Sequence, residues 1–254
     1  MSLGEERSRN VVPASTAPVT VSLGLPRVHH RLTDSTNERA KELAAKGAPH
    51  GTIVTADEQS AGRGRQGRAW MAEAGSALLV SVVLHDLDER SALLPLTTAV
   101  AVCEAAEACA PVTCAIKWPN DVWVERKKLA GILVEGRPQE GWAVAGVGLN
   151  VSGSPGELAD LATSLALESL VPGPRSPAAL LDALLVTLNR RLSDDPARVL
   201  RAWRARDALK GSRISWRDGE GEAAGIDDSG ALLVETADGR VALQAGEVHL
   251  SRVT

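Results

Sequence analysis

One short segment restricts the fold of this chain more than any other. Residues 61–68 read AGRGRQGR and lie between two apolar segments of strand length, 51–56 and 77–84. The string satisfies the G-x-G-x-x-G pattern of dinucleotide-binding folds, but that fold needs a helix directly after the glycines. Here residues 68–76 lead into a second strand instead. The sequence therefore predicts two strands joined by this loop, and it disfavours a dinucleotide-binding fold.

The same loop indicates an anionic ligand. It carries Arg63, Arg65 and Arg68, interleaved with glycines, in a chain of formal net charge -4. Glycines let backbone N–H groups approach a ligand closely, and arginines offer forked donors that match carboxylate and phosphate groups. Two alternatives stay open: a mobile Arg/Gly surface loop that binds RNA, and a purely structural loop. The single copy disfavours the first, and repulsion among three like charges disfavours the second.

The rest of the pattern predicts an α+β fold with a mixed β-sheet and flanking helices. Ser35 and Glu38 form a capping box, which marks the start of a helix that ends near Gly47. A hairpin across residues 126–128 favours antiparallel pairing, and the segment 77–84, apolar except for Ser81, predicts a central strand. The expected helices cover 35–47, 91–110, 177–192 and 197–209, and the expected strands cover 51–56, 77–84, 115–118, 122–125, 129–135 and 142–151.

Composition divides the chain into three parts. Residues 1–27 are polar and rich in Pro, Ser and Thr, so we expect a disordered leader. Residues 28–209 are expected to form the main domain. Residues 210–254 are expected to form a small β-barrel, because short strands there alternate with Gly/Asp turns. The strands of this small domain are expected over 213–216, 222–226, 231–235, 241–245 and 248–253.

Composition also excludes some classes of partner. The chain has six Trp and no Tyr or Phe, so its core is expected to consist of Ala, Val and Leu. The acidic net charge argues against nucleic acid as the main partner. We find no signal peptide and no run of 18 apolar residues that would span a membrane. Cys103, Cys109 and Cys114 lack metal-site spacing and are expected to be reduced and mostly buried.

Three further strings add polar groups. Residues 34–37 (DSTN) place small polar side chains in a row, and the helix cap alone is the plainer interpretation. Residues 117–121 (KWPND) suit a metal–nucleotide complex with Asp121 acting on Mg²⁺ directly or through water, although an ordinary turn is equally compatible. In residues 127–135 (KKLAGILVE), Gly131 could admit a flat ligand against the strand.

Together with GVGLN at 146–150, these strings resemble the biotin–protein ligases. DSTN, EQSAGRGRQGRAW (58–70), KWPND, KKLAGILVE and GVGLN occur in the order and spacing of that family. The resemblance implies a catalytic domain like that of class II aminoacyl-tRNA synthetases, with an SH3-like C-terminal β-barrel. It also implies that ATP activates biotin as biotinyl-5'-AMP, releasing pyrophosphate, before biotin is transferred to a carrier lysine.

The resemblance implies three groups of site residues, with the loop ordering over the adenylate. The catalytic residues are Lys128, Arg63 and Arg65. The biotin-binding residues are Ser35, Thr36, Asn37, Gln59, Arg63, Gly64, Arg65, Lys128, Gly131 and Gly148. The residues that bind ATP or adenylate are Arg65, Arg68, Trp70, Lys117, Asn120, Asp121 and Asn150, with Asp121 also expected to bind Mg²⁺.

The implied substrates are biotin and ATP with Mg²⁺, and the implied partner is the biotin carboxyl carrier protein domain of acyl-CoA carboxylases. We expect no nucleic-acid or membrane partner, a monomer or weak homodimer, and a cytoplasmic location. Residues 1–33 are expected to be too short for the DNA-binding domain of some relatives. Two departures from the family stand out. Gln66 stands where many relatives have Arg. Aromatic residues common in the family are missing, so Trp118 and Trp123 are expected to pack against the biotin ring. The alternatives are a lipoate-type ligase or acyltransferase of similar fold, and a non-catalytic ligand-binding module.

Overall fold

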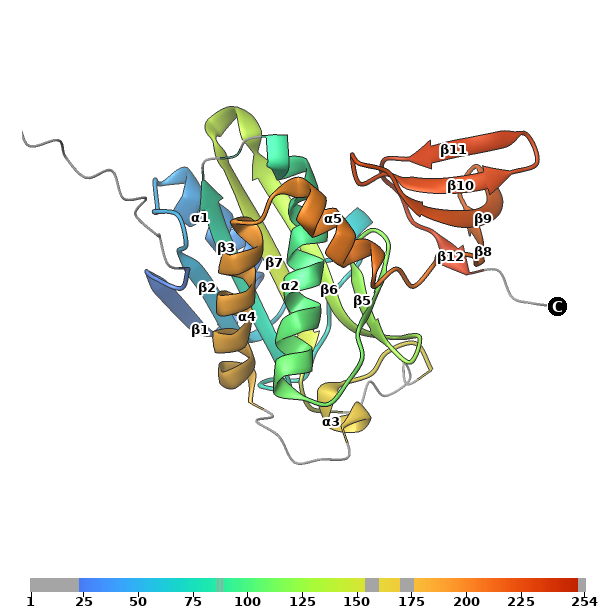
Figure 1. Ribbon diagram of the computed structural model, residues 1–254. Coiled ribbons are helices and arrows are strands. Elements are labelled where there is room, and N and C mark those ends of the chain that lie inside the picture. The colour runs from blue at the N-terminus through green and yellow to red at the C-terminus, as the bar shows by residue number, and fades with distance from the viewer. Residues whose placement is uncertain (1–22, 86, 88, 154–159, 170–175, 251–254) are drawn as a thin grey trace, which may run out of the picture.

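The computed structural model describes residues 23–85, 87, 89–153, 160–169 and 176–250. Its main part is a seven-stranded mixed sheet with helices on both faces, and a smaller antiparallel sheet follows it at the C-terminal end (Figure 1). This arrangement confirms the predicted α+β class.

The large sheet has the strand order β1-β2-β3-β7-β6-β5-β4. Strands β1 and β2 are parallel, and all other neighbours are antiparallel. Strand β3 lies in the interior of the sheet, as predicted, and its side chains are apolar on both faces except for Ser81 and the terminal His85. The strands are β1 (Arg27–Thr33), β2 (Ile53–Gln59), β3 (Ala77–His85), β4 (Ala115–Lys117), β5 (Asp121–Val124), β6 (Lys127–Arg137) and β7 (Trp142–Asn150).

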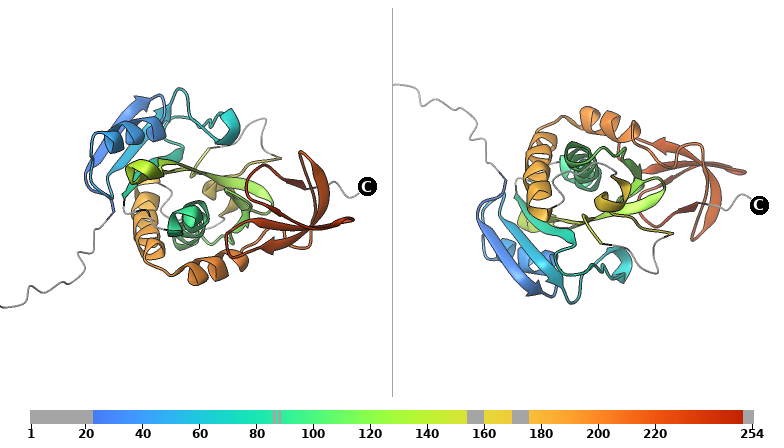
Figure 2. Two further views of the ribbon diagram at one scale, coloured as in Figure 1. Left: turned by 90° about the horizontal axis from the view of Figure 1, so that it is seen from above. Right: turned by 90° about the horizontal axis from the view of Figure 1, so that it is seen from below.

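Helices cover the two faces unequally (Figures 1 and 2). Helix α1 (Thr36–Ala45) packs against β2, β3 and β7 on one face. Helix α2 (Leu94–Cys109) packs on the other face, beside α4 (Pro177–Leu192) and α5 (Pro196–Arg204). Because one helix cannot cover seven strands, part of the α1 face stays open for the loop that follows β2. The short helices are η1 (Arg65–Gly67), η2 (Glu89–Leu93), η3 (Pro138–Glu140) and α3 (Leu165–Glu168).

Helix α2 forms the centre of the main core. With the turn before it, the helical stretch Ser91–Cys109 is the one described helix whose length and apolar composition would suffice to cross a membrane. However, 72% of it is buried inside the protein, as is typical of a core helix. Cys103 and Cys114 are buried and Cys109 is half-buried, and all three are free thiols, as predicted.

The C-terminal sheet has the strand order β11-β10-β9-β8-β12. No pairing that would close it into the expected barrel lies within the described residues. It contacts the main domain directly, since Trp118 Nε1 donates a hydrogen bond to the Gly230 carbonyl oxygen at 3.0 Å. The strands are β8 (Arg213–Trp216), β9 (Gly219–Ile226), β10 (Leu232–Thr236), β11 (Gly239–Leu243) and β12 (His249–Leu250).

Several local predictions need correction. Most of the expected leader, residues 1–22, lies outside the described residues, but Leu23 is buried and Arg27 begins β1, an edge strand that the sequence analysis missed. Ser35 is the N-cap of α1, yet its side chain makes no capping hydrogen bond. The predicted helix 197–209 ends at Arg204, and Asp207 beyond it pairs with Ile116 of β4 in an isolated parallel β-bridge.

Candidate functional site

Two cross-strand rows of the large sheet form the floor of a cavity on the α1 face. In one row, Gly148 of β7 lies between Leu79 of β3 and Gly131 of β6. In the neighbouring row, Gly146 of β7 pairs with Ser81 of β3. Since side chains alternate between the faces of a strand, the glycines remove bulk from one face only. The sheet is therefore hollowed beside α1.

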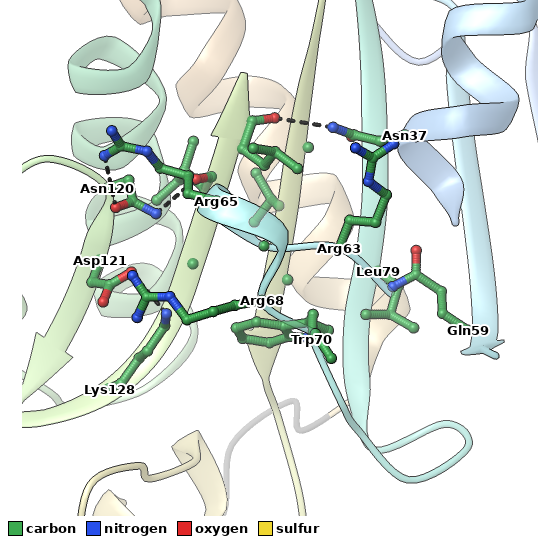
Figure 3. A pocket seen from close by; sticks show the side chains of 18 of the residues that line it. Asn37, Gln59, Arg63, Arg65, Arg68, Trp70, Leu79, Asn120, Asp121 and Lys128 are labelled. Carbon is green, nitrogen blue, oxygen red and sulfur yellow. Dashed lines mark hydrogen bonds and ion pairs between the residues drawn. The ribbon is translucent and has the colours of Figure 1, made fainter. Parts of the chain in front are cut away.

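The cavity above this floor has a volume of about 450 Å³, which is typical of small-molecule sites. The loop that follows β2 covers it, as Figure 3 shows. Most of the predicted site residues line it: Ser35, Thr36, Asn37, Gln59, Arg63, Gly64, Arg65, Arg68, Trp70, Lys117, Asn120, Asp121, Lys128, Gly131 and Gly148.

Hydrogen bonds connect the polar side chains at the α1 end of the cavity. Gln59 Oε1 accepts from the backbone N–H of Thr36 at 2.7 Å and from its hydroxyl at 3.1 Å. Ser81 Oγ donates to Asn37 Oδ1 at 2.7 Å. Because Gln59 Oε1 is occupied, Gln59 has its Nε2 donors left for a ligand. This end of the cavity therefore offers an amide donor and an amide acceptor.

The opposite end is rich in cations. Lys128 Nζ lies 2.8 Å from Asp121 Oδ1, and Arg65 Nη1 donates to Asn120 Oδ1 at 3.3 Å (Figure 3). Burial lowers the pKa of Arg65 and also that of Lys117, although Asp121 opposes both shifts. Cations that have lost part of their hydration gain most from an anion that replaces it. The geometry therefore favours a ligand that brings negative charge to this end.

The three arginines of the loop hold it against three different parts of the protein. Arg63 forms an ion pair with Glu38 of α1. Arg65 reaches the turn between β4 and β5. Arg68 Nη1 lies 2.7 Å from Glu247 Oε1, next to β12 in the C-terminal domain. The loop thus lies over the cavity and also contacts the second domain.

The backbone of the loop forms a small hairpin that needs its glycines. Gly62 and Trp70 pair through the Trp70 N–H and the Gly62 carbonyl oxygen at 2.9 Å, and Gly64 N–H donates to the Arg68 carbonyl oxygen at 2.7 Å. A side chain at Gly62 would begin 2.3 Å from the Trp70 carbonyl oxygen. At the tip Gln66 has a φ of 55°, in the left-handed region.

Trp70 lies with its ring on the glycine floor. A Cβ on Gly148 would come 2.5 Å from Trp70 Cε2, and one on Gly131 would come 3.1 Å from Cζ3. Lys128 Nζ is 5.6 Å from the ring centroid, within cation–π range. Trp70 Nε1 is buried and has no hydrogen-bond partner among the described residues. Such an orphaned donor is rare in folded proteins, and here it is packed against the glycine floor beside Gly148.

Two predictions about the site differ from the structure. Asn150 does not line the cavity; its Nδ2 donates to the Thr163 carbonyl oxygen at 2.9 Å. Trp118 packs toward the C-terminal domain instead, whereas Trp123 does line the cavity. The lining residues without a predicted role are Ala69, Leu79, Ile132, Leu133, Gly146, Val147, Leu161 and Ala162.

Some of these missed residues carried a sequence signal. Gly146 belongs to the GVGLN string and precedes Gly148 by two positions, so strand alternation places both on the same face. Leu133 lies two positions after Gly131 and could have been found in the same way. Leu161 and Ala162 come from the segment before α3, where no periodic pattern indicates which residues face the cavity.

The site can contribute little to a metal ion by itself. No group of three or more His, Cys, Asp or Glu side chains suited to a metal occurs in the part of the chain that the structure describes. Asp121 is the one carboxylate among the described lining residues. A single carboxylate fits Mg²⁺ that takes its other oxygen ligands from phosphates and water.

Comparisons with known proteins agree with this architecture. Residues 29–152 match the biotin/lipoate A/B protein ligase family, and residues 215–251 match the biotin protein ligase C-terminal domain. These two matches define the class: a ligase catalytic domain followed by its characteristic C-terminal domain.

Individual relatives narrow the assignment. The chain is 36% identical to the biotin--[acetyl-CoA-carboxylase] ligase of Mycobacterium tuberculosis over 86% of this chain and 86% of that protein. It is 34% identical to the bifunctional ligase/repressor BirA of Bacillus subtilis, over 91% of this chain and 76% of the relative. The structure resembles the biotin protein ligase of Aquifex aeolicus in complex with biotin and ATP, with a TM-score of 0.75 and 27% identity over 89% of this chain and 99% of that one. The chain belongs to the biotin protein ligase family.

Proposed function

We propose that this protein activates biotin with ATP and transfers it to a lysine of the biotin carboxyl carrier domain of an acyl-CoA carboxylase. In the first step, a carboxylate oxygen of biotin attacks the α-phosphorus of ATP, and pyrophosphate leaves. In the second step, the lysine amine attacks the carbonyl carbon of biotinyl-5'-AMP, an amide bond forms, and AMP and a proton are released. The observation that carries the proposal is the two-ended cavity, with an amide pair at one end and cations at the other.

The cationic end meets the main physical difficulty of the first step. A carboxylate and a triphosphate repel each other, so the transition state needs preorganised positive charge. Lys128, Arg63 and Arg65 supply it in the proposal, and Lys117 and Arg68 serve the nucleotide. All five line the cavity, and the buried surroundings of Arg65 strengthen its interaction with an anion.

The amide end suits the ureido ring of biotin. A cyclic urea presents N–H donors and a carbonyl acceptor side by side. Gln59 offers donors at Nε2, and Asn37 Oδ1 keeps one lone pair beyond the bond from Ser81. Ser35 and Thr36 complete this end of the wall. The apolar part of biotin then lies over Gly131 and Gly148 in the proposal.

Mg²⁺ would accompany ATP in this site. Asp121, beside Asn120, would hold the ion directly or through water, and the ion would neutralise phosphate charge. The chain's own residues must still exclude water, because biotinyl-5'-AMP is a mixed anhydride that hydrolyses readily. Arg63 and Arg68 draw the loop over the cavity from two sides, which is the arrangement that such protection requires.

A transfer assay tests the proposal. The protein is incubated with biotin, ATP, Mg²⁺ and a purified carrier domain, and the products are followed by mass spectrometry and by AMP and pyrophosphate release. We expect one AMP and one pyrophosphate for each biotin that becomes attached, with the adduct on a single lysine. A carrier with that lysine replaced by arginine is the control. Pyrophosphate release without any carrier adduct would contradict the transfer step.

Lipoate is the second candidate substrate, because the matched family also includes lipoate ligases. Lipoate has a carboxylate, so the cationic end would accept it equally well. Its dithiolane ring has no N–H or carbonyl group to pair with Asn37 and Gln59, and their polar atoms would stay unsatisfied. This mismatch favours biotin. That the protein binds neither nucleic acid nor membranes, is cytoplasmic and is a monomer or weak homodimer stays a prediction.

A further inference from the structure

A buried serine beneath the cavity has no assigned role. Ser81 lies in the middle of β3, where its neighbours along the strand are apolar, and it is 0% exposed. Its hydroxyl donates to Asn37 Oδ1 at 2.7 Å and lies 2.9 Å from Thr36 Oγ1. A polar group buried in the interior of a sheet destabilises the protein unless it is hydrogen-bonded. Here both partners belong to the cavity wall.

The Asn37 amide is held from its other side as well. Its Nδ2 donates to the Leu133 carbonyl oxygen at 3.2 Å and to Glu135 Oε2 at 2.9 Å. The primary amide has two N–H donors, so both are used within the protein. Ser81 occupies one lone pair of Oδ1, and the second lone pair is the only hydrogen-bonding capacity that Asn37 has left for a ligand.

The surroundings favour this orientation of the Asn37 amide over its 180° flip. A Cβ at Gly146 would come 2.1 Å from Asn37 Oδ1, so the amide can lie there only because position 146 has no side chain. An amide turned by 180° would bring Nδ2 to Ser81 and Oδ1 to Glu135. Its oxygen would then face a carboxylate oxygen and the Leu133 carbonyl oxygen, which is repulsive.

Glu135 also connects this network to the loop. Glu135 Oε1 lies 3.2 Å from Lys41 Nζ and 3.7 Å from Arg63 Nη2. Burial alone would raise the pKa of Glu135, but hydrogen bonds from Asn37 and Lys41 and the charges of Lys41 and Arg63 lower it. The carboxylate therefore stays charged and accepts from Asn37.

We propose that Ser81 and Glu135 are positioning residues: they fix the Asn37 amide so that Oδ1 faces the cavity as an acceptor for a ligand N–H. Neither touches the ligand in this proposal, and both act through Asn37. The inference rests on the proposed function, because the ligand N–H in question belongs to the ureido ring of biotin.

The test is a double-mutant cycle on the kinetics of biotin-dependent ATP–pyrophosphate exchange. Ser81→Ala removes the donor to Asn37 Oδ1 and should raise the KM for biotin about 10-fold, the effect of one buried hydrogen bond. The KM for ATP should stay within about twofold, because the nucleotide lies at the other end. In the Asn37→Ala background, Ser81→Ala should have no further effect on the KM for biotin. Glu135→Ala should also raise the KM for biotin, and its effect should be smaller in the Asn37→Ala background, where only its contacts with Lys41 and Arg63 are lost.

Two further variants separate positioning from a general loss of stability. Thr98→Ala removes an equally buried hydroxyl, which donates to the Leu94 carbonyl oxygen within α2, and it should leave the KM for biotin unchanged. Ser81→Cys keeps a similar volume and a weak donor, so it should raise the KM for biotin above the wild-type value but by less than about 10-fold, and it can be measured even if the alanine variant fails to fold.

The outcomes distinguish this inference from the proposed function. A wild-type protein with no biotin-dependent exchange would overturn both. Active wild type with an unchanged KM for biotin in folded Ser81→Ala, or an undiminished effect of Ser81→Ala in the Asn37→Ala background, would overturn the positioning role alone. A folded Ser81→Cys variant whose KM for biotin rises by more than about 10-fold, or does not rise at all, would count against it in the same way.

Discussion

Lys128 Nζ lies 2.8 Å from Asp121 Oδ1, across the hairpin that joins β5 and β6. The turn is tight, with Glu125 and Arg126 at φ of 48° and 64°, so the two strands bring a cation and a carboxylate to one point of the cavity. In the proposed reaction, Asp121 turns toward Mg²⁺ and Lys128 toward the biotin carboxylate and the α-phosphate. The ion pair thus keeps both groups in place before substrate enters.

Lys128→Ala should lower the adenylation rate about 100-fold, roughly 3 kcal/mol of transition-state stabilisation. The reason is the loss of a cation that faces the developing charge on the α-phosphate. Single-turnover formation of biotinyl-5'-AMP measures this rate directly. Lys127→Ala is the matched control, because Lys127 is adjacent in sequence but does not line the cavity, and it should retain nearly full activity. A Lys128→Ala variant that is as fast as wild type would remove Lys128 from the mechanism.

Gly148→Ala should destabilise the protein by about 1–3 kcal/mol, the usual result of overpacking. The added methyl would come 2.5 Å from the Trp70 ring, so the ring must move. Urea unfolding gives the change in the free energy of unfolding. In the Trp70→Ala background the same substitution should have less than half this effect, because the clash is absent. An equal loss in both backgrounds would show that the ring does not rest on Gly148.

The KM for ATP should depend on pH through Lys117. Burial lowers the pKa of Lys117 below its ordinary value of 10.5, so the free enzyme loses this cation at a lower pH than usual. Phosphate binding needs the charged form, and the KM for ATP should therefore rise as pH increases through the lowered pKa. Lys117→Arg stays charged and should lack this rise. Identical profiles for both proteins between about pH 7 and 10 would contradict this role for Lys117.

Much of the site could be predicted from local strings. The Gly/Arg loop, Lys128 and Ser35–Asn37 each belong to a short recognisable string, and the structure brings these distant strings together around one cavity. The floor was harder to predict. Which residues of β3 and β7 face each other depends on strand register, and Ser81 became visible as a partner of Asn37 only through that register.

Features at the edge of the sheet could not be predicted from local sequence patterns either. Strand β1 has a mixed polar sequence, RVHHRLT, with no clear alternation, and it becomes a strand because β2 offers it a parallel partner. Ser35 and Glu38 match a capping box in sequence, but Glu38 instead pairs with Lys41 at 2.9 Å and with Arg63. The Lys41 pair is local, but the pair with Arg63 spans 25 residues of sequence, and a local pattern does not contain it.

The loop over the cavity should become more ordered when substrates bind. Arg63 and Arg68 are 48% and 56% exposed at their side chains, and exposed ion pairs contribute only about 0–1 kcal/mol each. Hydrogen exchange of residues 61–70 should therefore slow when biotin and ATP are added together. Strand β3 is the internal control, since it is buried in either state. Exchange in the loop that biotin and ATP leave unchanged would contradict its role as a cover.

The central claim is that one cavity brings a carboxylic acid and ATP together for adenylation. Its most direct test is isotope exchange between pyrophosphate and ATP in the absence of any carrier, with biotin and lipoate compared at equal concentrations. We predict exchange that requires biotin, is weak or absent with lipoate alone, and is little inhibited when lipoate competes. Exchange that proceeds equally without biotin, or fails with biotin present, would contradict the claim.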